Sequence, residues 1–273
     1  MSLATSPSAQ GAASAPLLLV ERDARGVVTL TLNRPQAYNA LSRELLLALR
    51  DAVAPLRDDA QARVVVLRGA GKAFCAGHDL REMYPQAGTD AIAELFELCG
   101  RFMLDLVALP QPVIACVHGM ATAAGCQLVA QCDLALAASD ARFATSGVNL
   151  GLFCSTPSVP LGRNVSRKRA MEMLLTGEFI DAATACDWGL VNRVVAGAAL
   201  DDELEALLTQ ILAKPASAIA MGKAQFYRQI EMGLGGAYQL AAQTMVCNFH
   251  DGDTLEGVQA FLEKRAPTWK TPQ

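Results

Sequence analysis

The sequence has few of the side chains that hold metals or contact nucleic acids. It contains only three histidines, and no two of them have the H-x-x-x-H spacing of a zinc site. Lysine and arginine number 23 against 27 acidic residues, so the formal net charge is −4 and no basic block occurs. Nucleic-acid binding requires a concentrated positive surface. The composition therefore predicts no metal site and no nucleic-acid partner.

Long hydrophobic runs and closely spaced cysteine pairs are also absent. No uninterrupted apolar stretch approaches the roughly 20 residues that span a bilayer, so we expect no membrane span. The eight cysteines contain no C-x-x-C pair, and we interpret them as small buried hydrophobic residues in a reducing compartment. Residues 1–16 carry no charge and show neither a signal-peptide pattern nor the arginines of a transit peptide. We expect a disordered tail over 1–16 and a cytoplasmic location.

Hydrophobic residues make up 52% of the 273-residue chain, which is enough for a large core. The β-branched runs "ARVVVLRG" and "PVIACVHG" predict strands that are buried on both faces. A strand, strand, helix pattern recurs roughly every 45 to 50 residues. The sequence thus predicts an α/β fold of stacked ββα units with mainly parallel sheets, forming a core over residues 17–200.

Beyond residue 200 every segment has helical periodicity. The predicted helices cover 201–213, 216–232, 236–249 and 254–264. Parts of them are too apolar to stand free in water, so we expect them to cover a neighbouring element or another subunit. Residues 201–273 are therefore predicted to be a helical region that serves oligomerisation.

Two strand-to-helix junctions share one design. One ends in Ala76-Gly77-His78, and the other is "VHGMATAAGCQL", in which small residues precede a helix. The first N–H groups of a helix have no partner within it, and small side chains let a ligand approach them. Two such N–H groups that converge on one point form an oxyanion hole for a carbonyl that gains negative charge. Tight helix–strand packing also selects glycine and alanine, so spacing alone leaves both explanations open.

At these junctions the sequence resembles the enoyl-CoA hydratase/isomerase, or crotonase, family. The matching segments follow the family's order from about residue 17 to 270 and include "LTLNRPQAYNALS", "LRGAGKAFCAGHDLRE" and "CDLALAASDARFATSGVNLGLF". The resemblance implies a crotonase-like spiral of ββα units with a helical C-terminal trimerisation region. It also implies an acyl-CoA thioester as substrate, with coenzyme A as part of that substrate and no prosthetic group. The implied assembly is a homotrimer or a hexamer made of two trimers.

The same resemblance implies roles for individual residues. The oxyanion hole would use the backbone N–H groups of His78 and Ala124, with Gly125 beside them. The run 123–125 presents this amide provided that its backbone stays in an ordinary helical or β region. The implied coenzyme A contacts come from two early segments and one late helix: Arg34, Ala37, Ala76, Asp79, Leu80, Phe261 and Lys264. Lys264 is equally well explained as a solvated helix residue.

A hydratase of this family works with two glutamates, because water addition needs a base for the oxygen and an acid for the carbon. Gln127 stands at the first of these positions and Gly147 at the second. An amide does not titrate, and glycine offers only its backbone. The sequence is similar to a divergent branch of the family, and we expect inefficient hydration. Two hypotheses follow: an acyl-CoA enzyme with another reaction, or a non-catalytic acyl-CoA binder or assembly subunit.

Other side chains near the two positions are candidates for the missing acid or base. The His78 imidazole titrates in the right range, and Asp79 either caps the following turn or takes part in the chemistry. Asn149 and the segment 154–156 are expected to face the acyl pocket. Cys154 as a nucleophile needs a base partner. A related protease places its nucleophilic serine where this sequence has Ala123, so proteolysis is not expected.

Overall fold

The computed structural model describes residues 15–270, so most of the predicted disordered tail lies outside the described residues. The strands of a first sheet are β1 (Leu18–Arg22), β2 (Val27–Leu32), β3 (Val64–Gly69), β5 (Val113–Val117), β7 (Leu134–Ala138) and β10 (Arg193–Val195). The strands of a second sheet are β4 (Ala73–Cys75), β6 (Met120–Thr122), β8 (Arg142–Ala144) and β9 (Ile180–Asp181). The strand order is β1-β2-β3-β5-β7-β10 in the first sheet and β4-β6-β8-β9 in the second.

From β3 to β8, successive strands alternate between the two sheets. The pairs β3/β4, β5/β6 and β7/β8 all follow this rule, and their neighbours within each sheet are parallel. Only β1 with β2 and β8 with β9 pair antiparallel among the described strands. The predicted α/β spiral of ββα units with mainly parallel sheets is confirmed.

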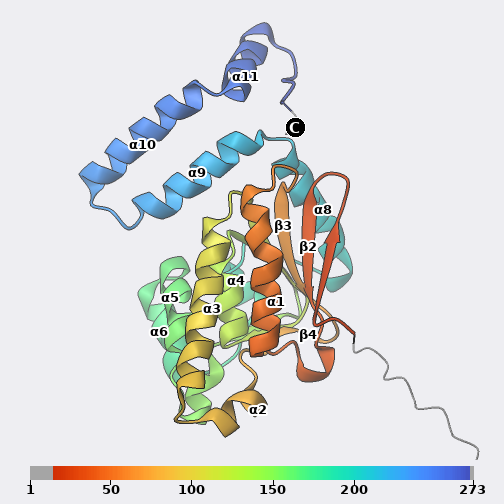
Figure 1. Cartoon of the computed structure of the whole chain (residues 1–273), viewed down its shortest axis with the longest axis vertical. Helices are drawn as coiled ribbons and strands as arrows, with labels where there is room; N and C mark the ends of the chain where they lie inside the picture. Colours follow the sequence, from red (N-terminus) through yellow and green to blue (C-terminus); the bar gives the residue numbers. More distant parts are fainter. Residues whose placement is uncertain (1–14, 271–273) are drawn as a thin grey trace, which may run out of the picture.

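Alternate residues of the buried strands face two different cores. Val65 packs with the helices α1 (Arg43–Val53) and α3 (Asp90–Ala108), whereas Val64 packs against α8 (Leu200–Leu212). The first sheet therefore lies between helices on both faces, as a parallel sheet requires (Figure 1). Six of the eight cysteines are buried, Cys186 is half-buried and Cys247 is exposed.

The other α-helices before residue 200 are short. They are α2 (Leu80–Met83), α4 (Ala124–Gln131), α5 (Ser155–Asn164), α6 (Arg167–Thr176) and α7 (Ala182–Trp188). The sequence analysis did not predict α5, because its segment contains Pro157 and Pro160. Pro157 lies in the first turn, where a helical N–H has no intrahelical partner to lose.

Three further helices, α9 (Ala216–Gln229), α10 (Leu234–Phe249) and α11 (Gly252–Glu263), project from the layered core (Figure 1). The four helices predicted after residue 200 are confirmed, with small shifts of their ends. The domain boundary at residue 200 stays a prediction. Within residues 15–270 no helix has the length and hydrophobicity required to cross a bilayer.

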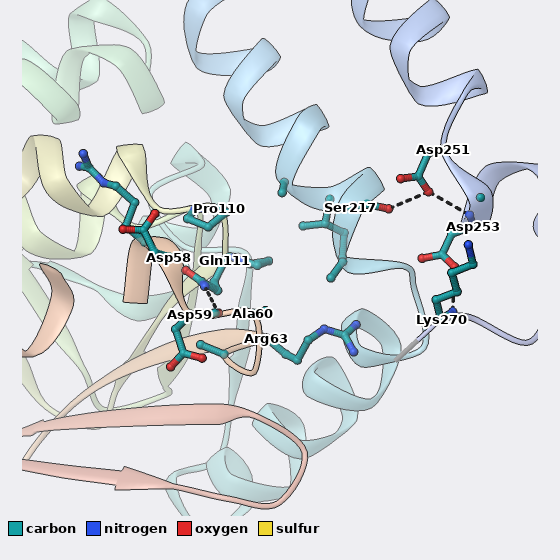
Figure 2. Close-up of a pocket in the computed structure, with 17 residues that line it drawn as sticks. Asp58, Asp59, Ala60, Arg63, Pro110, Gln111, Ser217, Asp251, Asp253 and Lys270 are labelled. Atoms are coloured by element: carbon teal, nitrogen blue, oxygen red, sulfur yellow. Dashed lines mark hydrogen bonds between the residues drawn. The ribbon is translucent and has the colours of Figure 1, made fainter. Parts of the chain in front are cut away.

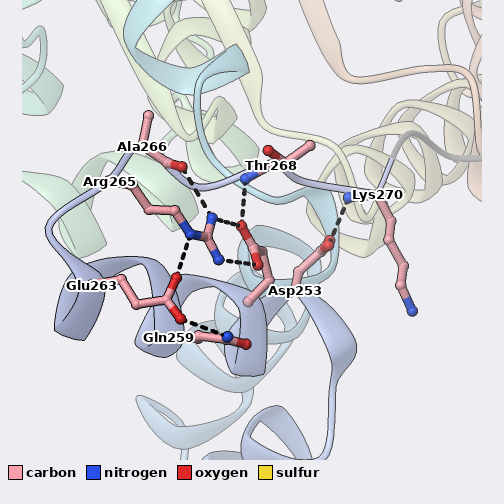
Figure 3. A network of polar contacts seen from close by, with 8 residues as sticks. Asp253, Gln259, Glu263, Arg265, Ala266, Thr268 and Lys270 are labelled. Atoms are coloured by element: carbon pink, nitrogen blue, oxygen red, sulfur yellow. Dashed lines mark hydrogen bonds and ion pairs between the residues drawn. The ribbon is translucent and has the colours of Figure 1, made fainter.

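The chain after α11 folds back onto that helix (Figure 3). Arg265 forms ion pairs with Glu256 and Glu263. The Thr268 N–H donates to Glu256 at 2.7 Å, and the Lys270 N–H donates to Asp253 at 2.8 Å. These contacts fasten the last described residues to α11.

Candidate functional site

The two junctions of the sequence touch one another. A β-carbon added to Gly77, which has φ +95°, would lie 2.9 Å from the Ala123 β-carbon and 3.3 Å from the Ala124 nitrogen. A β-carbon on Gly125 would lie 2.1 Å from the carbonyl oxygen of Cys75, at the end of β4. The small residues are therefore needed for packing, and this packing also brings the two candidate N–H groups together.

Neither candidate N–H group has a hydrogen-bond acceptor among the described residues. Ala124 is the first residue of α4, so its N–H has no partner within the helix. The Leu41 N–H donates to the Gly77 carbonyl at 2.7 Å, and the Asp79 N–H donates to the Leu41 carbonyl at 3.2 Å. These two hydrogen bonds involve the residues on either side of His78 and leave the His78 N–H unused. No hydrogen bond joins either N–H to another residue in the described part of the chain.

The backbone before the Ala124 amide is strained. Ala123 has φ 50° and ψ −119°, so the expected ordinary backbone region is wrong for this residue. A non-glycine residue in such a region costs on the order of 1–3 kcal/mol. The Ala123 N–H donates to the carbonyl of Ala144 in β8 at 3.0 Å, which holds the residue in place and starts α4 at Ala124.

A cavity of about 370 Å³ lies at these N–H groups. It brings together the predicted site residues Ala76, His78, Leu80, Ala124 and Gly147. The rest of its wall comes from Met83, Phe96, Ala123, Ser146, Leu150, Leu152, Phe153 and residues 154–157. The wall is mostly apolar with a few polar groups, which suits an acyl chain.

Several of these wall residues were not predicted. The sequence analysis missed Met83, Leu150 and Phe153, because apolar residues in loops and short helices carry no periodic signal. The expected segment 154–156 does line the cavity. Asn149 does not, because its side-chain amide donates to the carbonyl of Gly177 at 3.3 Å.

No carboxylate is among the cavity residues that the structure describes. Gln127 is buried in α4 outside the cavity wall, and its side-chain oxygen has no hydrogen-bond partner among the described residues. A β-carbon on Gly147 would lie 2.5 Å from the Leu152 carbonyl oxygen and 2.8 Å from the Cys154 sulfur. The loop 147–154 thus fills the space that a side chain at position 147 needs.

The His78 ring is the titratable group of the cavity with an unusual environment. It meets Phe96 edge to face, with the ring centroids 5.2 Å apart. Both ring nitrogens are buried, and no hydrogen bond of ordinary geometry joins them to another of residues 15–270, although the Leu41 backbone lies close enough to interact with the ring. Burial lowers the pKa of His78, and the nearby backbone of Leu41 opposes this effect only in part. The imidazole is therefore neutral near pH 7, with one nitrogen able to accept a proton.

Cys154 is the second titratable group in the cavity wall. Its sulfur accepts a hydrogen bond from the Gly147 N–H at 3.3 Å. Burial raises the pKa of the thiol, and this hydrogen bond opposes the effect only in part. A protonated thiol is a weak nucleophile, so the geometry does not favour a covalent role.

The early residues predicted to contact coenzyme A, Arg34 and Asp79, form an ion pair with each other. Arg34 Nη2 lies 2.8 Å from Asp79 Oδ2, and both side chains are largely buried. Asp79 also caps α2 as predicted, by accepting the Arg81 N–H at 3.1 Å. Ala37 is half-buried in the same loop. The Arg34 charge is neutralised within the chain, so coenzyme A contacts by this segment stay a prediction.

A residue that the sequence analysis did not single out fixes this loop. Asn39 is fully buried with φ 56°, and its amide donates to the carbonyls of Ala70 and Ala73 at 2.9 and 2.7 Å. Its side-chain oxygen accepts the Arg34 N–H at 2.9 Å. Asparagine tolerates this left-handed backbone, which is the signal that sequence analysis can use.

Phe261 and Lys264 are remote from the cavity within one chain. Phe261 is 81% exposed on α11, and Lys264 ends that helix with φ 57°. In Figure 1, α11 and α2 lie at opposite ends of the molecule. Their predicted contact with coenzyme A therefore requires a second subunit.

A larger cavity of about 520 Å³ lies between the core and the projecting helices (Figure 2). Charged side chains such as Arg63 and Asp251 line it, but they have partners: Arg63 donates to Lys214 O at 2.8 Å, and Asp251 accepts from Ser217 at 3.1 Å. None of the predicted site residues lines this cavity. Within the described residues no group of three or more histidine, cysteine, aspartate or glutamate side chains is arranged for a metal.

Comparisons with known proteins agree with the fold and the motifs. The family model described as enoyl-CoA hydratase/isomerase matches residues 22–272. A rat protein named enoyl-CoA hydratase domain-containing protein 3, mitochondrial, is 43% identical over 259 residues, which cover 95% of this chain and 86% of that protein. The crystal structure of an enoyl-CoA hydratase from Mycobacterium smegmatis has a TM-score of 0.92 and 62% identity, covering 93% of this chain and 99% of that chain.

The divergent branch predicted from the sequence is confirmed by these relatives. The crystal structure of human enoyl-CoA hydratase domain-containing protein 3 has a TM-score of 0.90 and 42% identity, covering 93% of this chain and 100% of that chain. The fold and the shared motifs therefore extend over nearly the whole chain.

The expected cytoplasmic location is wrong. The rat, mouse, frog and human relatives, which match more than nine tenths of this chain, are all named mitochondrial proteins. The expectation depended on the lack of a targeting pattern in residues 1–16, and such a lack does not establish a location. By the family model and the relatives together, this chain belongs to the enoyl-CoA hydratase/isomerase family.

Proposed function

We propose that this chain binds an acyl-CoA thioester and stabilises its enolate oxygen with the backbone N–H groups of His78 and Ala124. The contact of Gly77 with Ala123 and Ala124 carries this proposal, because it brings two unpartnered N–H groups to one apolar cavity. Such a site stabilises an oxyanion more than water does, because its hydrogen-bond donors are already oriented and water molecules must first reorient. Coenzyme A enters as part of the substrate, without a prosthetic group.

The reaction we propose is not efficient hydration. Each general acid or base contributes about 10²–10⁴-fold to a rate, and both usual glutamates are replaced, by Gln127 and Gly147. The oxyanion hole is independent of these carboxylates and retains its own contribution of roughly 10²–10³-fold. Reactions that depend on an enolate are therefore favoured over water addition.

Titration calorimetry with butyryl-CoA and turnover assays with crotonyl-CoA and a panel of acyl-CoA thioesters test the proposal. We expect binding, slow or absent hydration of crotonyl-CoA, and turnover of at least one other thioester. The variant Gly125→Ala is expected to weaken binding by displacing α4 from Cys75, whereas Gly100→Ala on α3 has open space and serves as a control. Failure to bind any thioester would refute the proposed function.

The second candidate is a non-catalytic acyl-CoA binder or an assembly subunit. The absence of a carboxylate from the cavity wall favours it. Binding of butyryl-CoA without turnover of any thioester in the panel would support this candidate over an enzyme.

We also propose that the chain works as a homotrimer, alone or as two stacked trimers. The projecting helices expose large apolar side chains, including Phe226, Tyr238, Phe249 and Phe261. Exposed apolar patches of this kind mark protein interfaces. Sedimentation velocity should give a mass of three or six chains, and a monomer at micromolar concentration would contradict the proposal.

A further inference from the structure

We propose that the cavity beside the oxyanion hole selects an uncharged acyl chain of medium length, and that Leu152 and Phe153 determine this preference. The inference rests on the proposed function, which places the thioester oxygen at the His78 and Ala124 N–H groups. The acyl chain is bonded to the same carbonyl carbon, so it starts where the cavity meets these groups. The composition and size of the cavity wall therefore decide which acyl chains the protein binds.

The cavity wall offers no partner to a charged acyl group. Among the residues that the structure describes, no lysine, arginine, aspartate or glutamate lines this cavity. A carboxylate that enters such a site loses its water without gaining a cation, which costs far more free energy than the entry of a methyl group. The wall therefore disfavours acyl groups that end in a carboxylate and favours plain hydrocarbon chains.

Two of the three hydroxyl side chains in the wall have partners within the protein. The Ser146 hydroxyl lies 2.8 Å from the Thr122 hydroxyl, and the Ser155 hydroxyl donates to the carbonyl of Phe153 at the long distance of 3.4 Å. The third hydroxyl belongs to Thr156, which is half-buried. The wall thus has few polar groups for a ligand, and recognition of the acyl group depends mainly on apolar contact.

Large apolar side chains of the wall are open to solvent in the free chain. Four of them are between 42% and 69% exposed: Leu80, Leu150, Leu152 and Phe153. A single exposed leucine is ordinary on a protein surface, but a group of large apolar side chains around one cavity indicates a binding site. A hydrocarbon chain that lies against them removes apolar surface of both partners from water, and this burial favours binding.

The cavity volume limits the length of the chain. A volume of about 370 Å³ lies near the lower end of the range for small-molecule sites, which is roughly 300–1,000 Å³. A water molecule has a share of about 30 Å³ in the liquid and a methylene group is of similar size, so the cavity holds roughly a dozen such groups. The thioester and the adjoining arm of coenzyme A occupy part of this space, which leaves room for roughly six to eight acyl carbons.

Leu152 and Phe153 lie in a loop whose backbone is fixed by hydrogen bonds. The Leu152 N–H donates to the Gly147 carbonyl at 3.0 Å, and the Ser155 N–H donates to the Phe153 carbonyl at 2.7 Å. A change to alanine at either position removes apolar surface but none of these hydrogen bonds. These two side chains are also the least exposed of the four, so we assign the chain-length preference to them.

Titration calorimetry with a series of saturated acyl-CoA thioesters tests the proposal. We expect the affinity to rise about fourfold for each added methylene group from butyryl-CoA to octanoyl-CoA, and to rise no further with dodecanoyl-CoA. Adipoyl-CoA matches hexanoyl-CoA in length but ends in a carboxylate, and it should bind at least about 100-fold more weakly. Equal affinities for butyryl-CoA and octanoyl-CoA, or for adipoyl-CoA and hexanoyl-CoA, would overturn the proposal.

Two variants test the assignment to individual residues. Leu152→Ala and Phe153→Ala should each weaken the binding of octanoyl-CoA about tenfold and change the binding of butyryl-CoA less than about twofold. The control Leu104→Ala changes a leucine on α3 that is 69% exposed and lies outside this wall, so both affinities should stay at the wild-type value. A merely structural role of the loop predicts equal losses for the two ligands, and that result would contradict the assignment.

The outcomes separate this inference from the proposed function. If no acyl-CoA binds, the proposed function fails and the inference fails with it. If butyryl-CoA binds but affinity does not depend on chain length, the inference is wrong while thioester binding stands. If the exposed apolar side chains serve a contact between subunits instead, Leu152→Ala should lower the mass in sedimentation velocity and leave the affinity for octanoyl-CoA unchanged, and this result would also overturn the inference.

Discussion

The ammonium nitrogen of Lys223 on α9 lies 2.7 Å from a carboxylate oxygen of Asp133 in the core. Lys223 also donates to the carbonyls of Leu106 and Gln111, at 3.1 and 2.9 Å. The other oxygen of Asp133 accepts from the Tyr227 hydroxyl at 2.8 Å. The Lys223 and Asp133 side chains are only 7% and 16% exposed. A buried polar cluster therefore joins the projecting helices to the core.

Replacing Lys223 with methionine should lower the free energy of unfolding by about 3–5 kcal/mol, because it leaves the buried Asp133 charge without its cation. Urea unfolding monitored by circular dichroism measures the loss. The variant Lys168→Met changes an exposed lysine on α6 and should stay within about 0.5 kcal/mol of the wild type. Equal losses for the two variants would contradict this prediction.

Gly125→Ala should destabilise the protein by about 1–3 kcal/mol, since the new methyl group lies 2.1 Å from the Cys75 carbonyl oxygen. Gly100→Ala adds the same methyl group within α3, where nothing lies within 4 Å. This second change should stabilise the protein by roughly 0.5–1 kcal/mol through helix propensity. Thermal unfolding of both variants checks the prediction, and a stable Gly125→Ala protein would show that α4 can shift away from β4.

Reintroducing both glutamates should not create a hydratase. In the variant Gln127→Glu with Gly147→Glu, the second side chain collides with the Leu152 carbonyl oxygen and the Cys154 sulfur. We expect no gain in crotonyl-CoA hydration and a stability loss of about 1–3 kcal/mol from overpacking. A rise in hydration rate would mean that the loop 147–154 adapts to the new side chain.

The stability of the wild-type protein should depend on His78 at mildly acidic pH. Burial lowers the pKa of His78 in the folded state below its ordinary value of about 6.5. At a pH between the folded-state and unfolded-state pKa of His78, the unfolded chain binds more protons than the folded protein. The contribution of the neutral histidine to the free energy of unfolding is therefore fully present above about pH 6.5 and is lost as the pH falls. The melting temperature should therefore fall less between about pH 7.5 and 5.5 in His78→Asn than in the wild type. Identical shifts in both proteins would contradict the buried, neutral histidine.

Continuous apolar runs in the strands and helical periodicity after residue 200 made the architecture predictable from sequence. The runs around Val65 and Ile114 are apolar at every position, which is the mark of a strand with helices on both faces. The helix over 155–164 was missed because Pro157 and Pro160 disfavour a helix interior, and tertiary contacts outweigh that local preference.

The site was predictable where it depends on the backbone. Glycine at position 77 and small residues at 123–125 indicated a close approach, and the structure shows one. Side-chain surroundings were not predictable in this way. Nothing in the sequence shows that Arg34 is neutralised by Asp79, or that the Cys154 sulfur occupies the space beside Gly147. Arg34 and Asp79 come from loops that are far apart in the chain, and the Cys154 contact depends on how the loop 147–154 folds back on itself.

The free N–H of His78 belongs to the peptide and not to the side chain. Among the twenty amino acids only proline lacks this group, so nearly every codon at position 78 preserves the donor. Mutation can therefore change the side chain at position 78 while the proposed donor for the ligand oxygen stays the same. A site built in this way is open to new reactions by single substitutions, because acquiring a new side chain does not remove the old binding group.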